Sequence, residues 1–117
     1  MKKDIKDLWV TTLRSGYFRQ TSGRLMRNTD QFCVLGVLCN ILFAEMNCVW
    51  EDTNYSARSF LGETAVLPKE VMTFCDIKTP TCELEYKGNK TSLTKLNDNG
   101  LMFSELADII ELNWENI

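Results

Sequence analysis

The chain of 117 residues suits one domain, and its 44% of hydrophobic residues is enough to build a single core. Its formal net charge of −3 does not favour nonspecific nucleic-acid binding. Histidine is absent, which excludes Ser–His and Cys–His nucleophile pairs, an imidazole base and histidine metal ligands. We therefore expect one domain, residues 1–117, in which binding is favoured over catalysis.

The N-terminal residues lead into no continuous apolar segment, so we expect no secretory signal and a place in the cytosol. The five cysteines are then expected as free thiols, and their odd number argues against a closed disulfide framework. The sequence contains no Cys-x-x-Cys pair. We therefore expect neither a metal site nor a cofactor.

Two elements are expected ahead of the longest apolar run. Apolar residues from Ile5 to Leu13 repeat at helical spacing and predict an amphipathic helix, which Gly16 ends. Residues 17–27 place three arginines beside a Thr-Ser-Gly turn, which predicts two short extended pieces around Gly23. Such a segment either holds a phosphate or carboxylate between guanidinium groups and backbone amides, or forms a solvated loop.

The longest apolar run, residues 32–43, predicts a central helix that is buried on most sides. The candidate N-caps are Asn28, Thr29 and Asp30, and Asn47 can close the helix in the left-handed conformation. One stripe of this helix carries only small or polar residues, namely Cys33, Gly36, Asn40, Ala44 and Asn47. Because glycine costs about 1 kcal/mol against alanine inside a helix, Gly36 implies the close approach of another backbone or of a ligand. The stripe predicts either a tight contact between helix and sheet or a pocket wall with Asn40 as its polar group.

Residues 51–63 are polar, rich in turn residues and long for a simple connection. We expect this segment to be mobile or functional, with Tyr55, Arg58 and Phe60 forming a lid. The Leu-Pro pair that begins at Leu67 then starts another helix, with proline at its first position.

Alternating residues at 82–86 and 90–93 predict a hairpin joined by a Gly-Asn turn. Residues 97–100, Asn-Asp-Asn-Gly, predict a further turn, and a last helix follows with Ser104 as its cap. The expected fold is α+β: a buried central helix, about three further helices, and a small antiparallel sheet or hairpins.

The order of these segments resembles a family of small proteins from tailed phages and prophages. The resemblance rests on Cys-x-Leu-Gly-Val-Leu-Cys from Cys33 to Cys39 and Leu-Asn-Asp-x-Gly from Leu96 to Gly100. It also includes residues 8–17, Gly23 with Leu25, Leu67 with Pro68, and residues 103–111, so it spans nearly the whole chain. Members often carry aspartate after the second cysteine, where this chain has Asn40. The resemblance implies a phage accessory protein in the cytoplasm of the infected bacterial host, with no established activity or catalytic residues.

These features predict a non-enzymatic binder that counters host defence by sequestering a small nucleotide-like signalling molecule. The expected ligand-binding residues are Arg19, Arg24, Arg27, Asn40, Asn97 and Asp98. Arginine would take a phosphate, asparagine would read a base edge, and Asp98 would accept a hydrogen bond from a ribose hydroxyl or an amine. The Gly23 segment should then lie beside residues 97–100, near the small stripe of the central helix.

Other classes of function stay open. One alternative is an inhibitor of a host protein through a protein–protein interface, and self-association as a homo-oligomer stays open as well. A small carboxylate-dependent hydrolase would use Asp98, Asp52 or Glu105 as acid or base, although no carboxylate pair stands out. A DNA-binding helix pair over residues 103–111 is disfavoured by the acidity of that segment. No membrane partner is expected, because the apolar run is too short to cross a bilayer.

Overall fold

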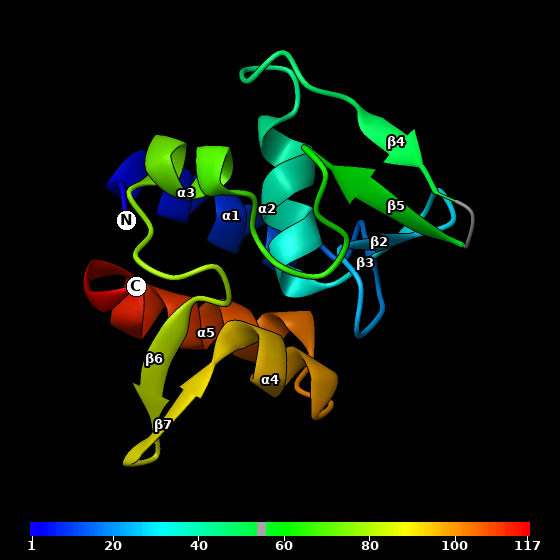
Figure 1. Cartoon of the computed structure of the whole chain (residues 1–117). Helices are drawn as coiled ribbons and strands as arrows, with labels where there is room; N and C mark the ends of the chain where they lie inside the picture. Colours follow the sequence, from blue (N-terminus) through cyan, green and yellow to red (C-terminus); the bar gives the residue numbers. More distant parts are fainter. Residues whose placement is uncertain (54–55) are drawn as a thin grey trace.

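The computed structural model describes residues 1–53 and 56–117 and has the α+β architecture expected from the sequence (Figure 1). The helices are α1 (Lys3–Arg14), α2 (Val34–Leu42), α3 (Lys69–Cys75), α4 (Leu93–Asp98) and α5 (Phe103–Asn113), and a 3-10 helix, Trp114–Asn116, follows α5. None of the described helices is long and apolar enough to cross a membrane.

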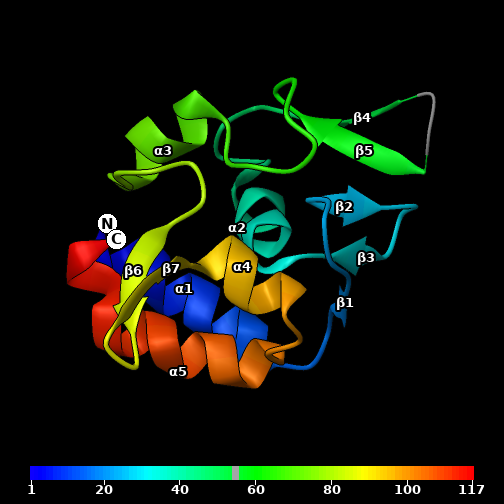
Figure 2. The same cartoon turned by 60° about the horizontal axis from the view of Figure 1, so that its bottom comes forward.

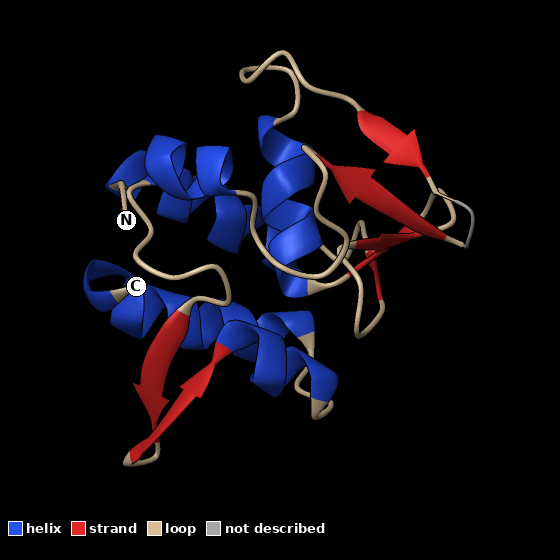
Figure 3. Ribbon diagram, viewed as in Figure 1, coloured by secondary structure: helices blue, strands red, loops and turns tan. Residues whose placement is uncertain are grey.

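The strands of the described residues form two separate sheets (Figure 3). The first sheet contains β1 (Arg19–Gln20), β2 (Met26–Arg27), β3 (Gln31–Phe32), β4 (Trp50–Asp52) and β5 (Ala57–Phe60) in the order β1-β3-β2-β5-β4. In this sheet β1 runs parallel to β3, and the other neighbours are antiparallel. The second sheet is the hairpin of β6 (Glu83–Tyr86) and β7 (Asn89–Ser92).

Helix α2 lies in the middle of the molecule, with the five-stranded sheet on one side and α1, α4 and α5 on the other (Figure 2). Its side chains are buried almost all round, and Leu35 and Leu38 are completely inaccessible to solvent. The Nε1–H of Trp9 on α1 donates a hydrogen bond of 3.0 Å to the carbonyl of Val34, which fixes α1 against the start of α2. The buried residues of both halves of the chain belong to one hydrophobic core.

Gly36 lies where the backbone before β2 crosses α2. A Cβ atom at this position would lie only 1.7 Å from the carbonyl oxygen of Leu25. The same carbonyl accepts a hydrogen bond of 3.2 Å from the amide of Cys33, so the crossing backbone is tied to the helix start. The tight contact between helix and sheet predicted for the small stripe is therefore confirmed at Gly36.

The predicted start of the central helix was wrong, because α2 begins only at Val34. The proposed caps Asn28, Thr29 and Asp30 form the connection between β2 and β3. Residues 31–32 pair with two other strands, and these pairings through space prevail over the local helical pattern. At the other end Asn47 has the predicted left-handed conformation, with a φ of 53°, but it lies beyond the helix, because α2 already ends at Leu42 with Phe43 as its C-cap.

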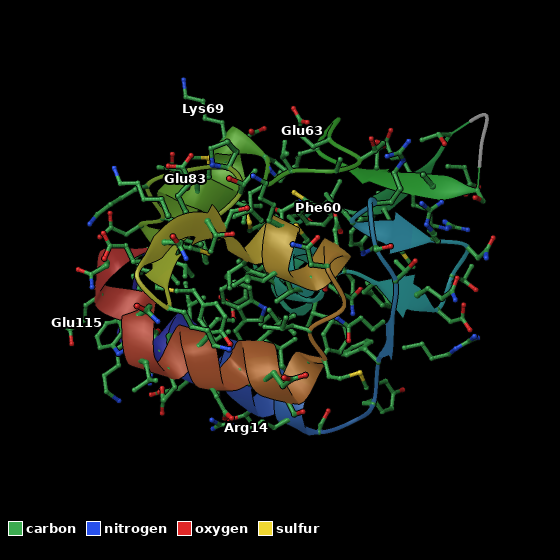
Figure 4. The ribbon with its side chains drawn as sticks, turned by 90° about the horizontal axis from the view of Figure 1, so that it is seen from below. Arg14, Phe60, Glu63, Lys69, Glu83 and Glu115 are labelled. Atoms are coloured by element: carbon green, nitrogen blue, oxygen red, sulfur yellow. The ribbon has the colours of Figure 1, made fainter. Side chains whose placement is uncertain are left out.

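The segment predicted as a lid is instead a β-hairpin, in which β4 pairs with β5. Phe60 is fully buried, and its ring lies inside the molecule (Figure 4). Arg58 donates from Nε to the carbonyl of Asn28 at 2.6 Å and forms an ion pair of 3.0 Å with Asp52. The lid prediction is therefore wrong for Arg58 and Phe60, because strand pairing and the core hold both; Tyr55 lies outside the described residues.

The C-terminal half follows the predictions with shifts of a few residues. Pro68 is the N-cap of α3 rather than its first residue, and the β6–β7 hairpin turns at Lys87-Gly88, both with positive φ. The short helix α4 was not predicted, because its last residues, Asn97 and Asp98, were assigned to a turn. Ser104 lies inside α5, so its predicted role as the cap was wrong.

Candidate functional site

The turn between β1 and β2 lies against the end of α4, as the sequence predicted. The backbone amide of Gly23 donates a hydrogen bond of 3.0 Å to Oδ1 of Asp98. Nearby, Nδ2 of Asn97 donates to the carbonyl of Thr21 at 2.8 Å. We call this contact between residues 20–27 and residues 97–98 the arginine-turn junction. Two polar segments that are about 75 residues apart in sequence therefore meet at one place.

Asn97 lies at the centre of the junction and is only 3% exposed. Its Oδ1 accepts hydrogen bonds from the backbone amide of Val34 at 3.1 Å and from Nε2 of Gln20 at 2.9 Å. Val34 is the first residue of α2, and its N-cap residue provides no side-chain cap. Asn97 therefore caps α2 from a distant part of the chain and satisfies a buried donor.

Gln20 is a junction residue that the sequence did not reveal. Its Nε2 also donates to the carbonyl of Leu101 at 2.8 Å, and its Oε1 accepts from the amide of Phe103 at 3.1 Å. The second bond caps the start of α5, together with Oε1 of Glu105, which accepts from the amide of Met102. These two glutamine and glutamate caps explain why Ser104 is not needed there. No local signal distinguishes Gln20 from any other polar strand residue.

Arg24 and Arg27 both bind carbonyls of the turn itself. Nη1 of Arg24 donates to the carbonyl of Gly23 at 2.7 Å, and Nε and Nη2 of Arg27 donate to the carbonyl of Ser22 at 3.3 and 3.2 Å. Neither guanidinium forms an ion pair with any carboxylate of the described residues. Gly23 has a φ of +78°, which suits glycine and allows the tight turn. Two positive charges are thus held on adjacent carbonyls without an ion pair to any described carboxylate.

Arg19 shares a face of the sheet with Arg27. Gln31 is the register partner of both arginines, and residues paired across strands point to the same face. The opposite face carries the buried side chains of Met26 and Phe32, so the arginine row points outward. Two strand spacings put the Cα atoms of Arg19 and Arg27 roughly 10 Å apart. Nη1 of Arg19 already has a partner, since it forms an ion pair of 2.9 Å with Asp30.

Asn40 is not brought into the junction. Its Oδ1 accepts a hydrogen bond of 3.0 Å from Nε1 of Trp50 in β4. Val34, which touches Asn97, lies six residues earlier, or about 9 Å away along the helix axis. The structure therefore places Asn40 beside the far edge strand and groups Arg24, Arg27, Asn97 and Asp98 at the turn, while Arg19 lies on the neighbouring strand β1. Ligand binding by these residues stays a prediction.

The cysteines are all free, as the sequence predicted. Burial raises the pKa of the Cys33 thiol to about 11 and that of Cys75 to about 12, and it raises the pKa values of Cys39 and Cys82 as well. These four thiols are therefore protonated and unreactive at neutral pH. Among the described residues, no group of three cysteine, aspartate or glutamate side chains is arranged to hold a metal ion.

The fold and the junction define a small α+β domain in which a C-terminal helix holds an arginine-bearing turn. The chain belongs to the family described as domain of unknown function DUF8296, whose model matches residues 1–114. No curated protein and no solved structure matches the chain. The family model covers nearly the whole chain, and its description names no activity.

Proposed function

We propose that this protein is a non-enzymatic binder that sequesters a small anionic, nucleotide-like molecule through the arginine-turn junction. In the setting that the sequence resemblance implies, it is a phage accessory protein that removes a host defence signal from the cytoplasm. The observation that carries the proposal is the pair of guanidinium groups, Arg24 and Arg27, which are held on one turn and form no ion pair with a carboxylate of the described residues.

Two like charges held on one turn repel each other, and an anion that binds both reduces that repulsion. A guanidinium group presents a planar fork of donors that matches a phosphate, and hydrogen bonds to charged groups are stronger than neutral ones. Because each arginine is already anchored to a carbonyl of the turn, little side-chain freedom is left to lose on binding. These contacts support phosphate recognition at the turn.

Asp98 gives the proposed site a second kind of group. One carboxylate oxygen accepts from the amide of Gly23, and the other is available to a hydroxyl or amine of the ligand. A phosphate and a ribose or base could thus be bound from the two sides of the same turn. In this proposal Asn97 and Gln20 do not contact the ligand. Their hydrogen bonds instead fix the backbone of the turn.

A binding role is favoured over hydrolysis by what the candidate carboxylates do. Asp52 forms an ion pair with Arg58, Glu105 caps the amide of Met102, and Asp98 holds the amide of Gly23. The three carboxylates lie on three different elements, β4, α5 and α4, and each is engaged by a different partner. General acid–base chemistry needs such groups to converge on one reacting atom.

The proposal is tested by thermal unfolding in the presence of mononucleotides, dinucleotides and cyclic dinucleotides. A ligand at 100 times its Kd stabilises the folded state by about 2.7 kcal/mol. The double variant Arg24→Ala with Arg27→Ala should lose this stabilisation while its unliganded melting temperature stays near that of the wild type. Lys69→Ala, which removes an exposed charge at the start of α3, is the matched control and should keep it. If no member of the panel raises the melting temperature, or if the double variant responds like the control, the proposal is wrong.

Inhibition of a host protein is the second candidate, and exposed apolar side chains favour it. The side chain of Tyr17 is 82% exposed and that of Met102 is 62% exposed. The bonds from Gln20 to residues 101 and 103 hold the two segments side by side. Tyr17→Ser together with Met102→Ser should abolish capture of a host protein and leave nucleotide stabilisation intact, which distinguishes the two functions.

A further inference from the structure

A groove lies away from the arginine-turn junction, where the β6–β7 hairpin meets the start of α4 and the end of α5 (Figures 1 and 2). Its volume is about 910 Å³, within the range of sites that enclose small molecules. Glu83, which lines it, projects from the hairpin on the side of the molecule opposite the first sheet (Figure 4). The groove lies at the start of α4, whereas the proposed anion site lies at the end of the same helix.

The charges that line the groove balance each other. Glu83 and Glu85 of β6 contribute two negative charges, and Lys90 of β7 and Lys95 of α4 contribute two positive ones. None of these four side chains has an ion pair within the part of the chain that the structure describes. A charged ligand would be attracted by one pair and repelled by the other. A hydroxyl group can instead donate to a carboxylate and accept from an ammonium group at the same time, so a neutral ligand suits both pairs.

A hydroxyl without a partner lies at the same groove. Oγ1 of Thr94 is buried and is the one buried side-chain polar atom of the described residues that makes no hydrogen bond. Most buried polar atoms form a hydrogen bond, so this hydroxyl is a candidate to bond a ligand. Threonine in a helix has two favoured side-chain positions, and rotation between them lets the hydroxyl meet a molecule in the groove.

Amide side chains complete the lining. Asn113 and Asn116 lie one helical turn apart at the C-terminal end of the molecule, and both line the groove. Nδ2 of Asn113 donates to the carbonyl of Ile109, which leaves its Oδ1 as an acceptor for other groups. Amides, carboxylates, ammonium groups and hydroxyls together offer donors and acceptors in one place, beside an apolar lining of similar extent.

We propose that this groove binds a neutral, hydroxyl-rich ligand of the carbohydrate class. Its hydroxyl groups bridge the carboxylates of β6 and the ammonium groups of Lys90 and Lys95, and one of them pairs with Thr94. The net charge of zero around the groove excludes the nucleotide-like anion proposed for the arginine turn. The chain thus carries two binding sites with different chemistry.

The experiment is a titration of the ¹⁵N-labelled chain with maltotriose and, separately, with chitotriose, followed by the amide signals. At up to about 10 mM, well above a millimolar Kd, at least one sugar should give saturable shifts confined to β6, β7, residues 94–95 and residues 113–116. No saturable shift with either sugar, or shifts at residues 21–27 instead, would overturn the proposal.

Two variants sharpen the result. Glu83→Gln keeps the shape of the side chain and should weaken sugar binding, because a carboxylate is a stronger acceptor than an amide. Thr94→Val should leave the melting temperature unchanged or raised and weaken binding roughly two- to tenfold, the effect of one hydrogen bond. Lys69→Ala, which lies outside the groove, should bind as the wild type does. If Thr94→Val and Glu83→Gln bind the sugar as tightly as the control, the groove is not its site.

Discussion

Replacing Asn97 by alanine gives the sharpest test of the junction. The change removes the acceptor of the Val34 amide, one of two acceptors of Gln20 Nε2, and the donor to the Thr21 carbonyl. The Val34 amide is buried, so losing its partner costs about 1–3 kcal/mol. Each of the two part-buried bonds adds about 0.5–1.5 kcal/mol. We therefore expect Asn97→Ala to destabilise the fold by roughly 4 kcal/mol.

That loss corresponds to a large shift in melting temperature. An unfolding entropy of about 2.1 cal/mol/K per residue gives about 0.25 kcal/mol/K for this chain, so 4 kcal/mol lowers Tm by roughly 16 °C. Circular dichroism during heating measures the shift, and urea unfolding provides an independent free energy. Asn99→Ala, an exposed asparagine two residues further on, is the matched control and should change Tm by less than about 2 °C. If Asn97→Ala behaves like Asn99→Ala, the reasoning that makes Asn97 a structural cap is refuted, and a direct ligand role becomes the better explanation.

Three further predictions follow from features described above or from a pair of charged residues on α1. Gly36→Ala should destabilise by about 1–3 kcal/mol in urea unfolding, because its Cβ must displace the Leu25 carbonyl; an unchanged midpoint would show that the crossing backbone yields freely. The hydrogen bond between Lys6 and Asp7 lowers the pKa of Asp7 and raises the pKa of Lys6. The pair should stabilise the fold less as the pH falls through the lowered pKa of Asp7, and also as the pH rises through the raised pKa of Lys6. Lys6→Met removes the pair, so the melting temperature of this variant should vary less with pH at both the acidic and the basic end. Iodoacetamide at pH 8 should label the half-buried Cys48 first and the other four cysteines only on unfolding, as mass spectrometry would show; rapid labelling of two or more would contradict the burial argument.

The elements that the sequence predicted best are those with local signals. Helix α1 has an apolar stripe and a glycine beyond its end, and the β6–β7 hairpin has alternation and a tight turn. The errors share a different cause. Residues 31–32 look helical until β1 and β2 pair with them, and α4 has only six residues that end in turn-forming asparagines. The pairing of strands that are distant in sequence cannot be predicted from the residues of a short window.

The candidate site shows the same division. That the arginine turn meets residues 97–98 was predictable, because both segments concentrate polar groups beside backbone that breaks local rules. The burial of Asn97 was not, since its partner Val34 lies 63 residues away and an asparagine in a turn sequence normally faces water. Gln20 was missed for a similar reason: its partners at residues 101 and 103 are set by the fold.

The long-range bonds of the junction also bear on how the protein folds. The contacts from residues 21–23 and Val34 to α4 close loops of 60 residues or more, and contacts of this kind form slowly because chain entropy opposes them. The native position of the arginine turn therefore depends on α4, which is synthesised about 75 residues later. The ligand binding proposed above would require α4 to have been synthesised and docked first.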